Sequence, residues 1–275
     1  MSLSSPYPDL DELLATVGEA GQRLSEINAS EGAAGNISIC IGWPMEVRRR
    51  FPVCRSIKLP HVVPALAGHV VLVTGSGRRL RDIPADPARN LCAVIVGEDG
   101  ESGWMHTVPG AIFENPTSEF NSHLAVHADQ VERSGTNFHA VIHAQPPHLT
   151  YLSHIPEYRD EAVLNRRLLR WEPETIVNLP RGLGVLPFIL PGSPALMQAT
   201  IASLRTHRVV LWSKHGVMAR SDVSATRAAD RVEYAETAAR YEYMDLVNHQ
   251  RAEGLTREEL HAVVDAFGIE TELLG

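Results

Sequence analysis

The spacing of apolar residues predicts several amphipathic helices. In the first, leucine and valine recur every three or four residues, so that one side is apolar, and glycines follow its end. The second is preceded by a Pro-Thr pair typical of a helix start. The last is a long alanine-rich run, for which Ser221 or Asp222 is the expected N-cap. The predicted helices span residues 10–27, 118–134, 161–173 and 222–250.

Short apolar runs, rich in β-branched residues and bounded by glycine, asparagine or proline, predict strands. These runs are residues 36–43, 68–77, 90–100, 138–145 and 209–219. The last run is expected to form a hairpin with its turn at His215–Gly216. Strands and helices alternate along the chain, and we find no internal repeat or linker. The sequence therefore predicts one α/β domain over residues 1–275, with a mixed sheet.

Composition narrows the class of protein. The chain has 275 residues, 44% of them hydrophobic, which is enough for one large domain or two small ones. Its net charge of −8 gives no reason to expect binding to nucleic acid or to an anionic membrane. The three arginines at 48–50 are expected to form a solvated loop.

The expected location is the cytoplasm. No apolar run is long enough to cross a membrane, and the first residues lack the basic start and apolar core of a signal peptide. Cys40, Cys54 and Cys92 are odd in number and far apart, so they are expected to be free thiols in a reducing compartment.

One strand carries candidate metal ligands. A period of two places His139, Val141, His143 and Gln145 on one face of the strand 138–145. Donors at alternate positions of a strand can bind one ion, and His215 at the predicted hairpin turn is a third donor. Three protein donors are typical of a catalytic zinc site, which leaves one position for substrate. The alternative is that each histidine only makes local hydrogen bonds.

Glu119 stands at the start of the helix 118–134 and has two possible roles. It is either a favourable charge or capping group at the helix N-terminus, or a general acid/base beside a bound anion. A phosphate nearby would raise the pKa of the carboxyl group, which suits proton transfer at neutral pH. The stretches TGSG (74–77) and EGAAGN (31–36) either approach a phosphate through backbone N–H groups or are plain connections.

Together these stretches resemble the class II aldolase/adducin superfamily, and within it most closely the rhamnulose-1-phosphate aldolases. The resemblance covers nearly the whole chain. Its motifs are, in order, AGNISI, VLVTGSGRRLRDIPADPARNL, PTSEFNSHL, HAVIHAQ, LGVLPFILPGS, VLWSKHGV and LTREELHAVVDAFGI. It implies an α/β/α fold around a central, mostly antiparallel sheet, and a C4 homotetramer whose site lies between neighbouring subunits. It also implies a lyase that cleaves a 1-phosphorylated ketose to dihydroxyacetone phosphate and an aldehyde through a metal-stabilised enediolate.

The same resemblance implies a role for individual residues. Glu119 is the implied acid/base, which protonates the enediolate carbon in cleavage and removes that proton in condensation. Glu174 is implied to reach the site from the adjacent subunit. The implied ligands of a divalent metal, expected to be zinc, are His143, Gln145 and His215. The implied substrate-binding residues are Asn36, Ser76, Gly77, Thr117 and Ser118.

Two positions depart from the family pattern. Gln145 stands where the family has its second zinc histidine, and an amide oxygen is a weaker zinc ligand than an imidazole. Manganese or cobalt is therefore an alternative to zinc, and His148 is a conceivable substitute ligand. Ala33 stands where these aldolases have an asparagine that helps to hold the phosphate. A different substrate is therefore an alternative.

Two other functions stay open at this point. One is an epimerase or decarboxylase of the same superfamily, and the other is a metal-free, adducin-like oligomer without catalytic activity. Schiff-base chemistry is not expected, because neither lysine of the chain, Lys58 or Lys214, lies in an obvious pocket motif.

Overall fold

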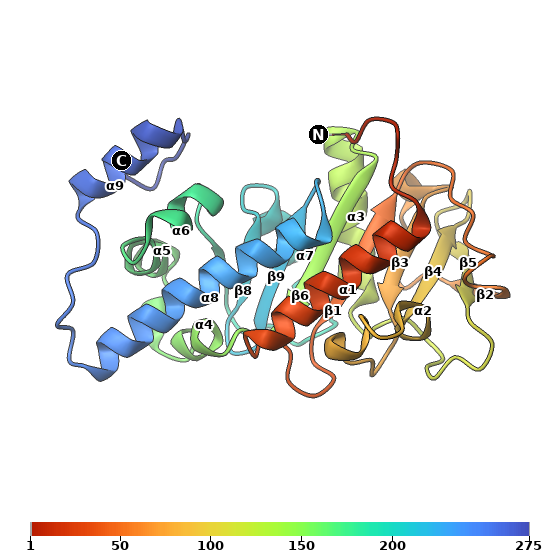
Figure 1. Ribbon diagram of the computed structural model, residues 1–275, viewed down its shortest axis with the longest axis horizontal. Helices are drawn as coiled ribbons and strands as arrows, with labels where there is room; N and C mark the ends of the chain where they lie inside the picture. The colour runs from red at the N-terminus through yellow and green to blue at the C-terminus, as the bar shows by residue number, and fades with distance from the viewer. Residues whose placement is uncertain (1, 275) are drawn as a thin grey trace.

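The computed structural model describes residues 2–274, which form a nine-stranded sheet with helices on both faces (Figure 1). The strand order is β2-β5-β4-β3-β1-β6-β9-β8-β7. Neighbouring strands in this described part are antiparallel, except that β7 runs parallel to β8. The strands are β1 (Asn36–Ile41), β2 (Val53–Lys58), β3 (Val70–Thr74), β4 (Leu91–Val96), β5 (Ser102–Thr107), β6 (Phe138–Ala144), β7 (Gly184–Leu186), β8 (Val209–Trp212) and β9 (Gly216–Ser221). The predicted α/β fold with a mostly antiparallel sheet is confirmed.

The helices form two layers and an end group (Figure 1). Helices α1 and α8 cross the near face of the sheet, while α3 and α7 pack together on the opposite face. The end group consists of α4, α5, α6 and α9, which lie around the C-terminal half of α8. The helices are α1 (Leu10–Glu26), α2 (Pro87–Asn90), α3 (Phe120–Ser134), α4 (Pro147–Leu152), α5 (Glu161–Leu169), α6 (Pro173–Asn178), α7 (Pro194–Leu204), α8 (Ala225–Val247) and α9 (Arg257–Phe267), with 3₁₀ turns η1 (Pro64–Leu66), η2 (Leu80–Asp82) and η3 (Pro156–Arg159).

Alternation along the two central strands separates an apolar face from a polar one. On β1, the isoleucines at 37, 39 and 41 belong to the core under α1 and α8, and the same core takes Phe138, Ala140 and Ile142 of β6. The residues between them face α3, where Ser38 and His139 contact histidines of that helix. The predicted alternation of β6 therefore holds, and it turns a row of polar side chains toward α3.

The start of the longest helix differs from its prediction. The N-cap of α8 is Ser224, whose side chain accepts a hydrogen bond from the backbone N–H of Arg227 at 2.9 Å. The predicted caps, Ser221 and Asp222, are wrong. Ser221 is still part of β9 and pairs with Ala140 of β6, so the sheet and not the helix determines its conformation.

Three strands, β2, β5 and β7, and one turn were not predicted correctly. Strands β2 and β5 form one edge of the sheet, and β2 exposes most of its residues, so it lacks the apolar pattern of a buried strand. The turn between β8 and β9 consists of residues 213–215, with Lys214 at a φ of 65°. Gly216 already belongs to β9, so the turn lies earlier than expected.

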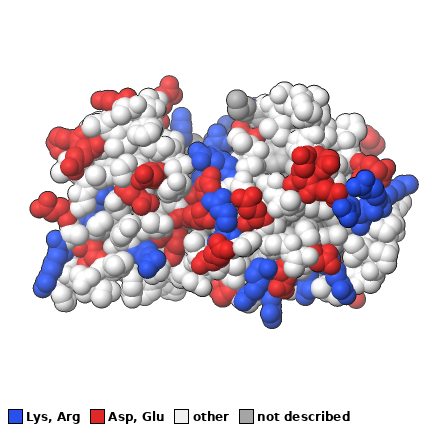
Figure 2. Space-filling view, in the orientation of Figure 1, with Lys and Arg blue, Asp and Glu red and all other residues white. Residues whose placement is uncertain are grey.

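The surface agrees with the composition. Figure 2 shows acidic and basic side chains close together on the face that carries α1 and α8. In the loop of three arginines, Arg49 and Arg50 pair with Asp11 of α1 and stay exposed. Cys40, Cys54 and Cys92 are free thiols. Within the described residues, no helix combines the length and apolar character needed to cross a membrane.

A buried ion pair ties α8 to the end group. The carboxylate of Glu242 is fully buried and accepts hydrogen bonds from Arg170 (3.0 Å), Trp171 (2.9 Å) and the hydroxyl of Tyr158. Arg170→Met removes the nearer cation of this carboxylate, leaving Arg167 at 3.9 Å, and also unpairs Asp245, so we expect the free energy of unfolding to fall by about 3–5 kcal/mol. Urea denaturation measures the free energy of unfolding. The control is Arg166→Met, because Arg166 lies on the exposed side of α5. Equal stability of the two variants would contradict this expectation.

Candidate active site

A cavity of about 230 Å³ lies where the ends of β1, β3 and β6 meet the N-terminus of α3. Its walls contain every residue of the predicted catalytic, metal-binding and substrate-binding sets, but not Glu174, which was predicted to act from the adjacent subunit. The lining residues are Ala33, Ala34, Gly35, Asn36, Gly75, Ser76, Gly77, Arg78, Thr117, Ser118, Glu119, His143, Gln145, Pro191 and His215. Segments far apart in the sequence thus meet at one place, as the predicted site requires.

One side of the cavity is suited to an anion. The backbone N–H of Thr117 donates to the carbonyl of Thr74 at 3.0 Å, which fixes the loop before α3 to the end of β3. Gly75 is required there, because a Cβ would lie 2.3 Å from the ring of Phe113. Gly77 has a φ of 70°, a conformation that favours glycine. Backbone N–H groups and three hydroxyl side chains (Ser76, Thr117 and Ser118) line this side, a combination that binds phosphate in other proteins.

The buried carboxylate of Glu119 occupies the centre of the site. Glu119 is at the N-cap position of α3 but makes no capping hydrogen bond with its side chain, which excludes the capping role. Its Oε2 accepts a hydrogen bond from Nδ2 of Asn36 at 3.0 Å and lies 3.6 Å from Nε2 of His143. Its Oε1 lies 3.8 Å from Nε2 of His215. The carboxylate therefore faces both histidines.

The pKa of Glu119 is lowered in this chain. Burial by itself raises the pKa, but the attraction of His143 and the hydrogen bond from Asn36 outweigh burial, with smaller contributions from His123 and His215. The carboxylate is therefore ionised, which is the form that accepts a proton. The raised pKa expected from the sequence depends on a phosphate beside Glu119 and does not describe the chain by itself.

The two histidines are oriented before any ligand binds. Nδ1 of His143 donates to the carbonyl of Val217 at 2.9 Å, which turns Nε2 toward Glu119. The His143 and His215 ring centroids are 4.8 Å apart, and Trp212 stacks against both rings. Burial lowers the pKa of His215 to about 4, helped by His143 and opposed by Glu119, so this imidazole is neutral. Neutral imidazoles are the form that binds metals.

The donor set fits a divalent cation. One ligand atom each from Glu119, His143 and His215 can be chosen such that all three lie within 4.8 Å of one another. Two imidazoles and a carboxylate form a common zinc-binding set. Gln145 lines the same cavity as a possible further oxygen donor. The alternative ligand His148 does not, since its Nδ1 is hydrogen-bonded to Glu236 of α8 at 2.6 Å.

Arg78 lines the cavity and was not predicted, although it directly follows the TGSG stretch; its Nε is buried without a hydrogen-bond partner in the described chain. Lys214, which lies in no obvious pocket motif of the sequence, is exposed and lines a neighbouring cavity of about 520 Å³ that shares Gln145 and His215. Glu174 is exposed on α6 and does not line the cavity of its own chain.

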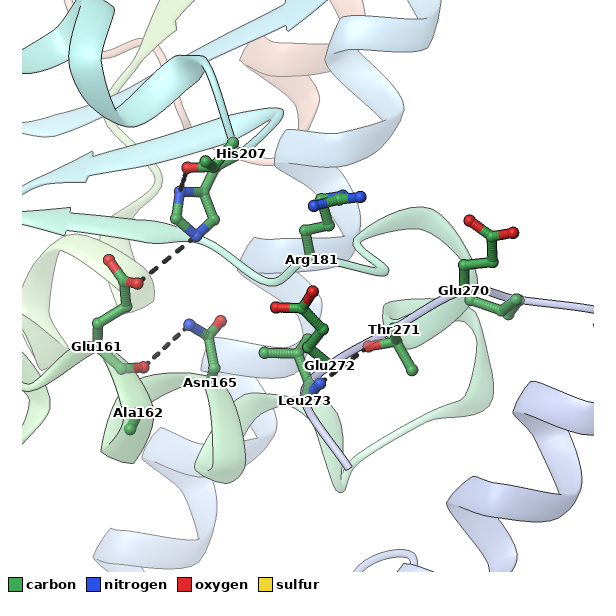
Figure 3. Close-up of a pocket in the computed structure, with 11 residues that line it drawn as sticks. Glu161, Ala162, Asn165, Arg181, His207, Glu270, Thr271, Glu272 and Leu273 are labelled. Carbon is green, nitrogen blue, oxygen red and sulfur yellow. Dashed lines mark hydrogen bonds and ion pairs between the residues drawn. The ribbon is translucent and has the colours of Figure 1, made fainter. Parts of the chain in front are cut away.

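A larger cavity, of about 800 Å³, lies between α5 and the C-terminal segment (Figure 3). Figure 3 shows Glu161 and His207 facing each other, with His207 Nε2 3.6 Å from Glu161 Oε1. This cavity holds a single histidine among acidic side chains, and among the described residues it has no cluster of three metal donors. Volume alone therefore does not identify the site.

Known proteins resemble this chain over most of its length. Residues 15–243 match the Class II Aldolase and Adducin N-terminal domain family. The chain is 33% identical over 216 residues to a rhamnulose-1-phosphate aldolase of Escherichia fergusonii, covering 78% of this chain and 77% of the relative. It is 30% identical over 271 residues to a rhamnulose-1-phosphate aldolase of Bacteroides thetaiotaomicron, covering 98% of both chains. The crystal structure of a sugar-phosphate aldolase from Thermotoga maritima matches with a TM-score of 0.75 and 28% identity, over 88% of this chain and 98% of that one.

Proposed function

Since this chain belongs to the class II aldolase and adducin family, we propose that it is a metal-dependent aldolase acting on a 1-phosphorylated ketose of the rhamnulose 1-phosphate type. The products are dihydroxyacetone phosphate and an aldehyde. The chain is an aldolase-type lyase, since its relatives of 30–33% identity are rhamnulose-1-phosphate aldolases. The observation that carries the finer proposal is that Glu119, His143 and His215 lie together beside an anion-binding wall.

Binding of the phosphate is assigned to the wall between β3 and α3. The hydroxyls of Ser76, Thr117 and Ser118 and the backbone N–H groups of Gly77 and Ser118 are the donors there, since the N–H groups of Ser76 and Thr117 already donate to carbonyls. Asn36 uses one N–H of its amide for Glu119, so the second N–H is free to donate to substrate. This binding places the ketose carbonyl toward the histidines and the carbon to be protonated toward Glu119.

His143 and His215, with Glu119 or Gln145, would hold a divalent metal, proposed to be zinc, which when bound would supply Lewis-acid stabilisation of negative charge on the ketose oxygens. Glu119 carries the proton. In cleavage, the hydroxyl on the carbon that becomes the aldehyde loses its proton as the carbon–carbon bond breaks; the ionised Glu119 takes up a proton and delivers it to the carbon that has lost its bond, and in condensation it removes that proton. The ionised form of Glu119 in the resting chain corresponds to the base of the condensation direction.

The experiment that tests this function is a substrate panel. Rhamnulose 1-phosphate, other 1-phosphorylated ketoses and their unphosphorylated forms are incubated with zinc-loaded protein, and dihydroxyacetone phosphate is measured. We expect cleavage of at least one phosphorylated ketose and much slower cleavage of its unphosphorylated form. Turnover of a hydroxy acid or an epimerisation, with no cleavage of any ketose phosphate, would instead indicate an epimerase or decarboxylase, which the exposed Ala33 in the cavity wall leaves room for.

Arg78 is expected to contribute to phosphate binding, because it is a cation in the same wall. Arg78→Ala should raise KM for the phosphorylated ketose by roughly 10- to 100-fold, the equivalent of about 1.5–3 kcal/mol for a hydrogen bond to a charged group, with a smaller effect on kcat. Steady-state kinetics measure this, with Arg79→Ala as the control because Arg79 is exposed outside the cavity lining. Equal KM values for the two variants would show that Arg78 does not contact the phosphate.

We also propose the extent and assembly of the domain. Helix α9 lies beyond the family match, yet its Leu260 packs against Leu169 and Ile176 near α8, so that residues 1–275 form one domain. The exposed Glu174 is then free to reach the site of a neighbouring subunit in a homotetramer. Light scattering at micromolar concentration is expected to give four times the chain mass, and a monomer would refute the assembly.

A further inference from the structure

A row of hydrogen bonds leads from Glu119 into the core between β1, β6 and α3. Its members are all buried and contact one another in sequence: Glu119, Asn36, His123, Ser38, His127 and His139. His123 and His127 are one helical turn apart on α3, and the Ser38 hydroxyl of β1 lies between their rings, 2.6 Å from the first and 2.7 Å from the second. Burying this many polar groups costs free energy unless each bond is made, so the direction of each bond matters.

The direction is set by the amide of Asn36. Its NH₂ group donates to Oε2 of Glu119 at 3.0 Å, which turns its carbonyl oxygen to the other side. The Asn36 carbonyl oxygen then faces Nε2 of His123 and can only accept, which places a proton on that nitrogen. Because His123 is fully buried without a carboxylate in contact with it, the imidazole is neutral, and burial lowers its pKa to about 3.

The remaining bonds follow from the first two. A neutral His123 with a proton on Nε2 has a lone pair on Nδ1, which accepts the single hydroxyl proton of Ser38. Ser38 therefore accepts its other bond from Nε2–H of His127. Burial also lowers the pKa values of His127 and His139 well below the usual value. Neutral His127 accepts at Nδ1 from Nδ1–H of His139, 2.8 Å away.

Every bond in the row therefore donates toward Glu119. The far end agrees with this direction, because Nε2 of His139 is left as a lone pair and is buried without a hydrogen-bond partner in the described chain. Rotating the Asn36 amide by half a turn would place its carbonyl oxygen against the carboxylate and its NH₂ against the proton of His123. One arrangement of protons thus satisfies all five contacts.

We propose that His123, Ser38 and His127 are positioning residues that lock the amide of Asn36 with its NH₂ group toward Glu119, and so hold the acid/base carboxylate in its reactive orientation. The inference rests on the proposed function, since it assigns these residues to the support of Glu119. These three residues act on Glu119 through Asn36 and contact no substrate themselves. Loss of this lock releases rotation of both Asn36 and Glu119, and a small displacement of a reacting group lowers the rate more than it weakens binding.

A kinetic comparison tests the effect on catalysis. His123→Phe keeps the ring volume but donates nothing, whereas His123→Gln offers an amide N–H that can reach the carbonyl of Asn36. On a ketose phosphate that the wild type cleaves, the phenylalanine variant should lose about 10- to 100-fold in kcat, with a smaller rise in KM because Asn36 also donates to the substrate. The glutamine variant should recover most of that loss. Wild-type kcat in His123→Phe, or no recovery in His123→Gln, would overturn the proposal.

Neutron diffraction from deuterium-exchanged crystals of the wild-type protein tests the lock without any activity measurement. The expected deuterium positions are Nε2 of His123, Nε2 of His127 and Nδ1 of His139, with the ND₂ group of Asn36 toward Glu119. Deuterium on Nδ1 of His123, or the Asn36 oxygen toward Glu119, would refute the lock even in an active enzyme. Conversely, the expected positions in a protein that cleaves no ketose phosphate would refute the proposed function and leave the arrangement of protons intact.

Discussion

Glu119→Gln is expected to lower kcat for cleavage of the ketose phosphate by about 10²–10⁴-fold, the usual contribution of a general acid/base. Glutamine has the shape of glutamate, and its amide oxygen can still accept the hydrogen bond from Asn36. What it cannot do is take up or deliver a proton. Since His143 and His215 remain, the variant should stay folded and bind metal.

The control for this prediction is Glu114→Gln, which makes the same change of charge at an exposed position outside the cavity lining. Its kcat should equal that of the wild type. Both variants are compared in single-turnover experiments, so that slow product release does not conceal the proton-transfer step. A wild-type rate in Glu119→Gln would show that another group carries the proton.

The second large effect concerns the metal. His143→Ala removes the imidazole whose Nε2 is oriented toward Glu119, and it should abolish zinc binding and turnover together. A ligand that binds only the folded state, at a free concentration 100 times its Kd, adds about 2.7 kcal/mol to the free energy of unfolding. We therefore expect zinc to raise the Tm of the wild type and to leave that of His143→Ala unchanged.

Gln145→His should act in the opposite direction. An imidazole at this position adds a third nitrogen donor to the cavity, so zinc affinity should rise, because imidazole suits zinc better than an amide oxygen does. Competition with a chelator measures the affinity of each variant. His148→Ala is the matched control, because this histidine is hydrogen-bonded to Glu236 and should not affect zinc affinity. If Gln145→His leaves zinc affinity unchanged while His143→Ala still binds zinc, the strand is structural.

The alternation of β6 could be predicted from the sequence, since strand periodicity depends on neighbouring residues. The proximity of His143 and His215 could not be predicted from the sequence. It depends on the pairing of β6 with β9, which brings the turn residue His215 to the end of β6 that carries His143. The role of Glu119 was equally open, since a glutamate at a helix start often caps it; the absence of a capping bond excludes that role.

Other features depended on contacts that no local pattern reports. The edge strand β2 is exposed, and Arg55 lies between Val53 and Ile57 on one face, so no continuous apolar face gave a strand signal. The sequence gives no sign that Ser38 contacts His123 and His127. Only the packing of α3 on β1 brings these side chains within hydrogen-bonding distance. Arg78 had a signal, as the residue after a glycine turn, but the turn alone did not show that its side chain reaches the cavity.

The central claim is that this chain is a metal-dependent aldolase for a phosphorylated ketose. The most direct measurement is the release of dihydroxyacetone phosphate from rhamnulose 1-phosphate by protein that has been stripped with a chelator and then reloaded with zinc. The account predicts that activity is lost on stripping and restored by zinc in wild type, and that zinc restores none in His143→Ala. Unchanged cleavage by the stripped protein, or no cleavage of any 1-phosphorylated ketose by the zinc-loaded protein, would contradict it.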